Sequence, residues 1–455
     1  MKLLLQLFLG ALFVFPAFGQ ESLNMNLLYN WNDPTIPPTS AYNNPYNEIW
    51  GYEANGHEYA IVGSTIGTHI LDITDVSNVI EVDFVPGAAQ GANIVHRDMH
   101  DYNGYLYMVC QEGASTLQIA DLRYLPDSVH VVYDSNELIK GSHNIFIDTA
   151  SAKLYAMDVY PPSGSLIGLR ILSLEEPVNP EFLYDMHVGS DVHDIFVRND
   201  TAFLNRGWNS SLEVWNFADT QNPVLLGSLT DYPGQGYNHA GYLDASGNTY
   251  VLADETHGSP LKIMDVSDLS DMEIVSTVTS GVASSSIAHN PIIHGDLMYS
   301  SYYYDGVYVW NIADPLNPQL VGFYDTSTIP NSTGYQGCWG VYPFLSSGKI
   351  LASDMQNGMY VLELEESTVG VNEQSGLPNG FELYPNPSQG YVYLSFDNSL
   401  TKEFVVNIYS LTGQKVYSER IDKSTTKINT SELNKGIYLV ELAGEAVLTK
   451  KLVVK

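Results

Sequence analysis

The stretch HILDITDVSNV, residues 69–79, sets a pattern that recurs along most of this chain. Apolar and polar residues alternate and then give way to Asp, Ser and Asn, which predicts a strand that runs into a turn. Related segments occupy residues 117–128, 169–180, 212–223, 261–271, 307–318 and 359–365. Two further strand-like segments precede each of them, and a fourth follows all but the last. The chain therefore contains seven repeats of one small antiparallel unit.

Repeats of 40–50 residues with three or four strands each are typical of a β-propeller. We therefore predict an all-β protein whose residues 20–365 form a seven-bladed β-propeller. The last unit stops after its third strand, whereas residues 24–31 resemble the fourth strands of the other units. We expect this N-terminal segment to complete the last blade, which would close the ring and remove an exposed sheet edge.

The repeated strand ending in Asp or Asn, as in HILDITD, LKIMDVSD and VYVWNIAD, is similar to the LVIVD repeat. The arrangement from about Ser22 to Glu365 resembles the choice-of-anchor B family of exported bacterial proteins. The resemblance implies a propeller at the cell surface and assigns no activity to it.

The first 19 residues have the pattern of a secretory signal peptide. Lys2 precedes an apolar run, and Ala17-Phe18-Gly19 offers a small-x-small cleavage site. The apolar run is short for a membrane span, and no later segment is apolar enough to cross a bilayer. We therefore expect an exported mature chain without a transmembrane segment.

The C-terminal part of the chain differs in composition from the propeller. Residues 366–380 are polar, with Gly and Pro, and are expected to form a linker. Residues 381–455 alternate as short strands and predict a small β-sandwich. This module resembles the type A sorting domain of type IX secretion. The matching motifs are Tyr384-Pro385-Asn386-Pro387, Leu411-Thr412-Gly413, Gly436-Ile437-Tyr438 and Lys451-Leu452-Val453-Val454-Lys455. The resemblance implies contact with the type IX machinery and display at the surface of a Gram-negative bacterium, or release from it.

The net charge of −33 arises because 19 Lys and Arg face 52 Asp and Glu, although charged residues make up only 16% of the chain. Residues 381–455 carry nine basic and eight acidic groups, so the remaining 10 − 44 = −34 belongs to the rest of the chain. An acidic surface of this kind repels phosphate backbones, which excludes nucleic acid as a partner. It suits cations or neutral extracellular ligands.

Histidine recurs where the innermost strand of each predicted blade begins. The aligned residues are Trp50, His100, His143, His193, His239, His289 and Trp339, at spacings of 50, 43, 50, 46, 50 and 50. Two residues earlier, on the same strand face, lie Glu48, Asp98 and Asp191. The adjacent loops would add Arg206, Trp208, Asp254 and Glu255 to this face.

Imidazole and carboxylate together suit a divalent transition metal, and His100, His143, His193, His239 and His289 are the candidate ligands. Trp50, Trp339, Asp98, Asp191, Arg206, Trp208, Asp254 and Glu255 are candidates for contacting an extracellular ligand. Two other interpretations stay open. The histidines could tie neighbouring blades through their ring N–H groups, or they could serve a ligand directly as acids and bases.

These patterns favour a secreted surface propeller that binds a ligand or a metal on its histidine-bearing face. The alternative is a metal-dependent lyase or hydrolase that acts on a polysaccharide or another extracellular polymer, with a histidine as base and Arg206 neutralising an acid group. A purely adhesive protein is the third possibility.

Overall fold

This computed structural model describes residues 21–186, 192–365, 381–388, 390–396, 404–410, 415–421, 425–431, 433–443 and 447–455. The predicted signal peptide and the predicted linker lie outside the described residues. The chain divides into two units, Met1–Glu365 and Glu366–Lys455. All the regular elements described are β-strands.

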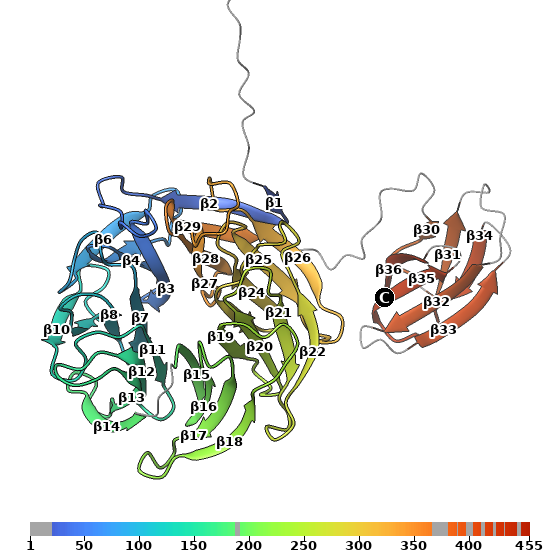
Figure 1. The fold of residues 1–455 in the computed structure, drawn as a ribbon. Coiled ribbons are helices and arrows are strands. Elements are labelled where there is room, and N and C mark those ends of the chain that lie inside the picture. Colours follow the sequence, from blue (N-terminus) through green and yellow to red (C-terminus); the bar gives the residue numbers. More distant parts are fainter. Residues whose placement is uncertain are drawn as a thin grey trace, which may run out of the picture. The chain divides into compact units, whose positions relative to one another are not determined.

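The first unit is built from antiparallel sheets that are arranged around a central axis (Figure 1). Five of them take four consecutive strands each. These are β3 (Tyr46–Ala54), β4 (His57–Ser64), β5 (Gly67–Asp72) and β6 (Ile80–Pro86); β7 (Arg97–Tyr102), β8 (Tyr105–Cys110), β9 (Leu117–Asp121) and β10 (His130–Ser135); β11 (Asn144–Asp148), β12 (Lys153–Val159), β13 (Ile167–Ser173) and β14 (Glu181–Met186); β15 (Asp194–Arg198), β16 (Thr201–Asn205), β17 (Leu212–Asn216) and β18 (Val224–Leu229); and β19 (Asn238–Leu243), β20 (Thr249–Asp254), β21 (Leu261–Asp265) and β22 (Glu273–Val278).

The other two sheets of this unit combine the two ends of the repeat region. One contains β23 (Pro291–His294), β24 (Leu297–Ser301), β25 (Val307–Asn311) and β26 (Gln319–Tyr324), with β1 (Ser22–Leu23) at its outer edge. The other contains β27 (Cys338–Tyr342), β28 (Lys349–Asp354) and β29 (Gly358–Leu364), followed by β2 (Met25–Trp31). Strand β2 pairs with β29 from Met25 opposite Leu364 to Trp31 opposite Met359. The segment that resembles a fourth strand therefore pairs as one.

The first strand of each sheet lies near the axis. These inner strands are β3, β7, β11, β15, β19, β23 and β27, and each contacts the next, with β27 contacting β3. The circuit of inner strands is therefore closed, and the unit has the architecture of a β-propeller. Apolar clusters fill the space between neighbouring sheets, with fully buried residues such as Leu154, Tyr155 and Leu252.

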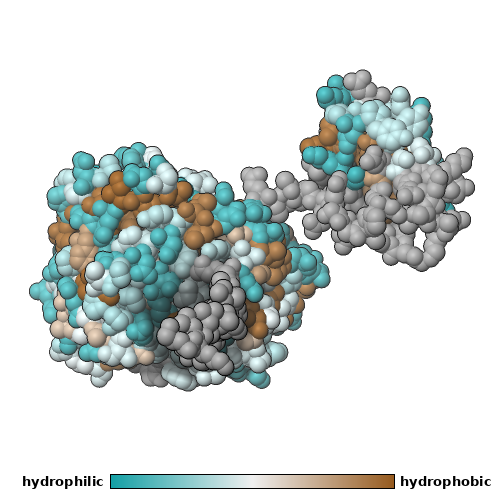
Figure 2. Space-filling view, turned by 90° about the horizontal axis from the view of Figure 1, so that it is seen from above, coloured by the Kyte–Doolittle hydropathy of each residue, from teal (hydrophilic) through white to brown (hydrophobic). Residues whose placement is uncertain are grey.

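The outer strands are partly exposed and of mixed polarity. Leu27 on β2 and Leu320 on β26 are 41% and 43% exposed. Figure 2 views the molecule from the side of β1 and β2, and shows brown apolar patches among teal polar ones. The β-period of two explains this mixture, since alternate side chains of an outer strand face solvent.

The second unit contains two antiparallel sheets. One is formed by β30 (Phe381–Tyr384), β31 (Tyr391–Phe396) and β34 (Thr425–Asn429), the other by β33 (Lys415–Ile421), β32 (Phe404–Ser410), β35 (Gly436–Ala443) and β36 (Val447–Val454). Val392 and Ile428 of the first sheet share one apolar core with Val406, Val440 and Leu452 of the second. The two sheets thus bury a common interior.

Candidate metal-binding cavity

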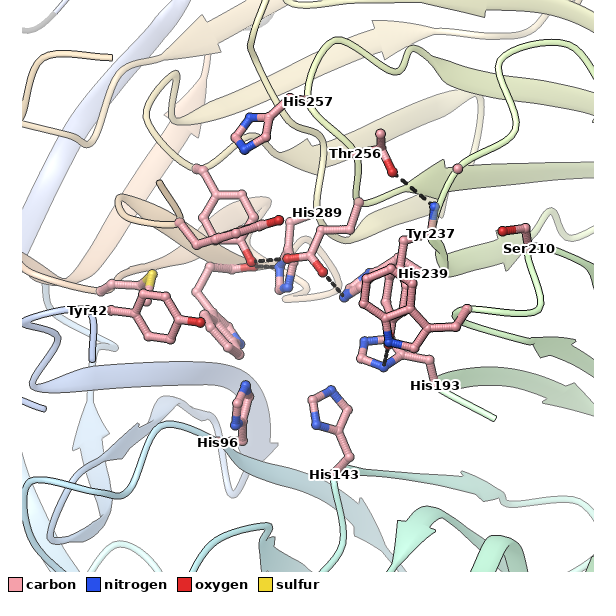
Figure 3. Close-up of a pocket in the computed structure, with 17 residues that line it drawn as sticks. Tyr42, His96, His143, His193, Ser210, Tyr237, His239, Thr256, His257 and His289 are labelled. Carbon is pink, nitrogen blue, oxygen red and sulfur yellow. Dashed lines mark hydrogen bonds and ion pairs between the residues drawn. The ribbon is translucent and has the colours of Figure 1, made fainter. Parts of the chain in front are cut away.

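A cavity of about 610 Å³ opens at the end of the propeller axis where most of the inner strands begin. Six imidazoles line it (Figure 3). Trp339 lines it as well, and five of the imidazoles form a circuit with this indole, whereas His257 lies outside that circuit. We call His96, His143, His193, His239 and His289 the histidine ring. Trp339 closes the circuit, because each of the six aromatic rings contacts the next. The centroid distances, taken in order from His96–His143 to Trp339–His96, are 4.8, 4.3, 4.4, 4.5, 4.9 and 5.4 Å.

The histidine ring includes one member that the sequence pattern had assigned differently. His96 precedes β7 directly, as His143 precedes β11 and His193 precedes β15. His100 lies four residues further along β7, which places it about 13 Å deeper at a rise of ~3.3 Å per residue. It lines a second cavity with Trp50 and Asp98. The prediction that Trp50 and His100 share the position of the other histidines was therefore wrong, because the register of the first two repeats had been shifted.

Hydrogen bonds fix the Nδ1 atoms of four ring members. His96 Nδ1 contacts Glu112 Oε1 at 2.5 Å, and His143 Nδ1 contacts Gln111 Oε1 at 2.9 Å. His289 Nδ1 donates to the carbonyl of Trp339 at 2.5 Å. His193 Nδ1 contacts the hydroxyl of Tyr237 at 2.7 Å. Held at Nδ1, an imidazole can offer Nε2 to an ion.

The bond from His289 to Trp339 is the tie between neighbouring sheets that the architectural interpretation expects. The bonds of His143 to Gln111 and of His193 to Tyr237 also join neighbouring repeats, through side chains, whereas the bond between His96 and Glu112 stays within one repeat. His193 Nε2 is buried and has no hydrogen-bond partner among the described residues. Buried polar atoms normally have a hydrogen-bond partner, so an unpartnered ring nitrogen is free to bind a ligand.

His193, His239 and Glu255 form the one cluster of potential metal ligands found in the described part of the chain. One ligand atom from each lies within 4.8 Å of the others. His239 Nε2 is 3.8 Å from Glu255 Oε2, and Tyr303 donates its hydroxyl to Glu255 Oε1 at 2.5 Å. Tetrahedral ligands at ~2.1 Å from a zinc-like ion lie about 3.4 Å apart, so small side-chain rotations would complete the site. Two imidazoles and one carboxylate suit Zn, Mn or Fe.

Burial sets the charge of these groups. It lowers the pKa values of His143, His193 and His239 well below the ordinary value, and the neighbouring histidines lower them further. Burial also lowers the pKa of His289, to about 4. These four imidazoles are therefore neutral at pH 7, which is the form that binds metal ions. Burial raises the pKa of Glu255 to about 7, against the hydrogen bond from Tyr303.

Aromatic side chains form the walls of the cavity mouth. Trp208 is 82% exposed and packs edge-on against Tyr237, with ring centroids 4.8 Å apart. Across the cavity, Tyr335 packs edge-on against Tyr42 and Tyr303. No Lys or Arg is found among the described residues that line the cavity. A bound cation would therefore be the main positive charge in the cavity.

Two predicted ligand-binding residues have structural partners instead. Arg206 is 5% exposed, its guanidinium pairs with Glu213, and it is not among the described residues that line the cavity. Asp254 is fully buried and accepts a bond from Lys262 Nζ at 2.5 Å. These positions correct the expectation that both would face a ligand. Their neighbours Trp208 and Glu255 do line the cavity, and Asp191 lies outside the described residues.

Several residues that shape the axis were not singled out from the sequence. His96 continues the histidine spacing better than His100, since it lies 47 residues before His143 and the following spacings are 50, 46, 50 and 50. Asp194, rather than Asp191, is the counterpart of Glu48 and Asp98 along the axis. Tyr237 gave no repeat signal, because a loop places it.

The buried carboxyl groups should make the stability of the propeller depend on pH. Burial raises the pKa of Glu48 to about 7, so between pH 4.5 and 7 the native state binds a proton that the unfolded state has released. Stability should therefore fall as pH rises through this window. In Glu48→Gln the fall between pH 5 and pH 8 should be smaller by about 1–3 kcal/mol.

Chemical denaturation at the two pH values measures this difference. Glu48 accepts a bond from the indole of Trp339 at 3.1 Å, and its loss costs stability at both pH values. The difference in stability between the two pH values therefore reports the titration of the carboxyl group, separately from the lost hydrogen bond. An unchanged pH slope in the variant would show that Glu48 does not titrate in this range.

Comparison with known proteins assigns a class to each unit. Residues 382–455 match the family described as "Secretion system C-terminal sorting domain". This end of the chain is thus a sorting domain for the type IX secretion machinery, which indicates export to the cell surface or the medium. No curated protein matches the chain. Among the described residues, no helix is long and apolar enough to cross a membrane.

Solved structures support the propeller fold. The chain is similar to the RRP9 WD40 repeats, with 10% identity, a TM-score of 0.52 and coverage of 76% of this chain and 100% of that one. It is also similar to the periplasmic gluconolactonase PpgL of Pseudomonas aeruginosa, with 10% identity, a TM-score of 0.51 and coverage of 84% and 98%. At this identity the likeness concerns the fold alone. The protein is therefore an exported β-propeller with a C-terminal secretion signal.

Proposed function

We propose that this protein is a surface-displayed metal-binding propeller that holds one divalent transition metal ion at His193, His239 and Glu255. The observation that carries the proposal is the convergence of these three groups in one cavity, with His193 Nε2 buried and unpartnered. The neutral imidazoles supply nitrogen ligands, and Tyr303 orients the carboxylate as an outer partner. The acidic charge of the unit favours approach of a cation.

The wider architecture belongs to the same proposal. We infer that the seven antiparallel sheets are the seven blades of one ring, which β2 closes, and that the C-terminal sheets form a sandwich. Residues 1–19 would be the signal peptide, and the propeller would belong to the choice-of-anchor B family. Removal of the sorting domain would leave the propeller at the outer surface of a Gram-negative bacterium, or released from it.

Metal content after purification without chelators tests the site. We expect about one equivalent of Mn, Fe or Zn in the wild type, because the three ligands form one site. His193→Ala and Glu255→Gln should retain less than a tenth of it. Glu255→Gln can still accept the hydroxyl of Tyr303, so the local fold is preserved. Elemental analysis measures the metal content, and thermal unfolding of the same samples measures whether the fold is preserved.

His130→Ala is the matched control, because His130 is exposed on β10, away from the cavity. It should keep the metal. A wild type that stays metal-free after incubation with Mn²⁺ and Zn²⁺ would contradict the proposal. Equal metal content in Glu255→Gln would also contradict it.

A metal-dependent lyase or hydrolase is the second candidate function. Three protein ligands leave a coordination position open, as catalytic zinc sites do. His143 lies next to His193, with ring centroids 4.3 Å apart, and is neutral. It is thus suited to act as a general base on an extracellular polymer. Assays of the metal-loaded protein on polysaccharides should distinguish this candidate, since His143→Gln would abolish turnover and leave the metal bound.

A further inference from the structure

A second cavity of about 160 Å³ lies further along the axis, and six of the seven rings of a closed aromatic circuit line it. We call this circuit the aromatic collar. Its members in order are Trp50, His100, Phe146, Phe196, Tyr242, Phe344 and Tyr342, of which Phe196 contacts its two neighbours but does not line the cavity. Each contacts the next and the last contacts the first, at centroid distances of 4.3, 5.3, 5.5, 4.6, 6.1, 5.3 and 5.1 Å. Gly51 leaves room for Tyr342, since a Cβ there would overlap that ring.

Three carboxylates line the same cavity. Glu48, Asp98 and Asp194 each precede a collar residue by two positions, so they share its strand face and lie about 6.6 Å along the strand from it. Within the described residues none of them pairs with Lys, Arg or His. The repeat has therefore placed three acids beside seven aromatic rings.

The partners of these carboxylates are uncharged. Glu48 accepts bonds from the backbone of Ile49 and the indole of Trp339, at 2.9 and 3.1 Å. Asp98 accepts from the backbone of Met99 and Ile145, at 2.8 and 2.6 Å. Buried negative charge without a counter-ion is costly, and burial accordingly raises the pKa of Glu48 and of Asp194 to about 7 and that of Asp98 well above its usual value. A cation in the cavity would offset that cost for all three groups at once.

A third observation marks the same cavity. Asn290 lines it, and its Oδ1 is buried without a hydrogen-bond partner among the described residues. A buried acceptor normally receives a hydrogen bond, and this oxygen receives none from the described residues. It is available to the polarised C–H or N–H groups of an organic cation.

An inorganic ion does not fit these groups as well. A metal ion needs its ligand atoms within a few ångströms of one another, as at His193, His239 and Glu255. In the described part of the chain no such convergence occurs at Glu48, Asp98 and Asp194. Six aromatic rings line the cavity beside the carboxylates. Ring faces attract alkylated ammonium groups, whose charge is spread over methyl groups.

We propose that the aromatic collar and its three carboxylates bind a methylated ammonium group of a small organic cation. The rings contact the methyl groups through cation–π attraction, and the carboxylates neutralise the charge. The site is separate from the histidine ring and does not depend on a metal there.

Calorimetric titration of the full-length secreted chain with choline chloride tests this site. We expect one choline per chain. The carbon isostere 3,3-dimethyl-1-butanol has the same shape without charge and should bind at least tenfold more weakly. Trp50→Leu, which opens the collar, and Glu48→Gln, which removes one charge, should each weaken choline binding at least tenfold.

Tyr124→Leu is the matched control, because Tyr124 is exposed and lies outside both cavities. It should bind choline as the wild type does. Uptake of one equivalent of Mn²⁺ at the histidine ring by Trp50→Leu and Glu48→Gln would show that both variants are folded. Equal binding of choline and its isostere, or unchanged binding by both variants, would overturn the proposal. So would a second equivalent of Mn²⁺ that Glu48→Gln removes, since an inorganic ion would then be the occupant.

Discussion

Deletion of residues 22–31 is expected to lower the unfolding midpoint of the propeller by about 10 °C or more, or to abolish cooperative unfolding. The deletion removes β1 and β2, so β29 would become an exposed edge. It also removes Met25, which is 2% exposed in the apolar core next to Leu362, and Trp31, which packs against Tyr46. Thermal unfolding followed by circular dichroism measures the effect.

Deletion of residues 366–455 is the control for the N-terminal deletion. It removes a larger part of the chain but a separate compact unit, so the midpoint of the propeller should stay within a few degrees. If loss of residues 22–31 were equally harmless, β2 would be a dispensable attachment rather than part of the ring.

Replacing Asp254 with Ala is expected to destabilise the propeller by about 3–5 kcal/mol, because it leaves a buried ammonium group unpaired. Asp254 and Lys262 are both fully buried, with Nζ and Oδ2 2.5 Å apart. Asp254 also accepts the hydroxyl of Tyr232 at 2.8 Å. Urea denaturation should show a lower midpoint with an unchanged slope.

The double variant Asp254→Ala with Lys262→Met separates lost charge pairing from lost volume. It removes both charges, so most of the stability should return. Arg123→Ala removes a guanidinium that is largely exposed and should change little. An Asp254→Ala midpoint equal to that of the wild type would show that the pair does not stabilise the fold.

The fold could be predicted from the sequence because each repeat carries its own local signal. Alternation of the kind seen in residues 69–79 predicts strands, and Asp-rich turns end them. Residues 24–31 could be recognised as a fourth strand by their similarity to the other outer strands, and they pair with β29. The sorting domain was recognisable because its motifs occur in order at the C-terminus, and residues 382–455 match that family.

The site was predicted only in part, for two physical reasons. A shift of four residues leaves every side chain on the same face of a strand, so the alternation alone did not decide between His96 and His100 as the counterpart of the other histidines. Burial was the second reason. Arg206 and Asp254 have the chemistry of ligand contacts, but their partners Glu213 and Lys262 follow from three-dimensional packing. Similarly, no spacing predicts that Tyr303 bonds to Glu255.

The pairing of β2 with β29 has a consequence for how the protein is made. Asn26 bonds to Glu365, which lies 339 positions further along the chain. Whatever order the other sheets form in, this contact waits until the entire repeat region has been synthesised. The entropy of closing so long a loop grows only slowly with its length, so the step is delayed rather than prevented. Until then β2 and the edge of β29 that it covers both stay without their partner strand.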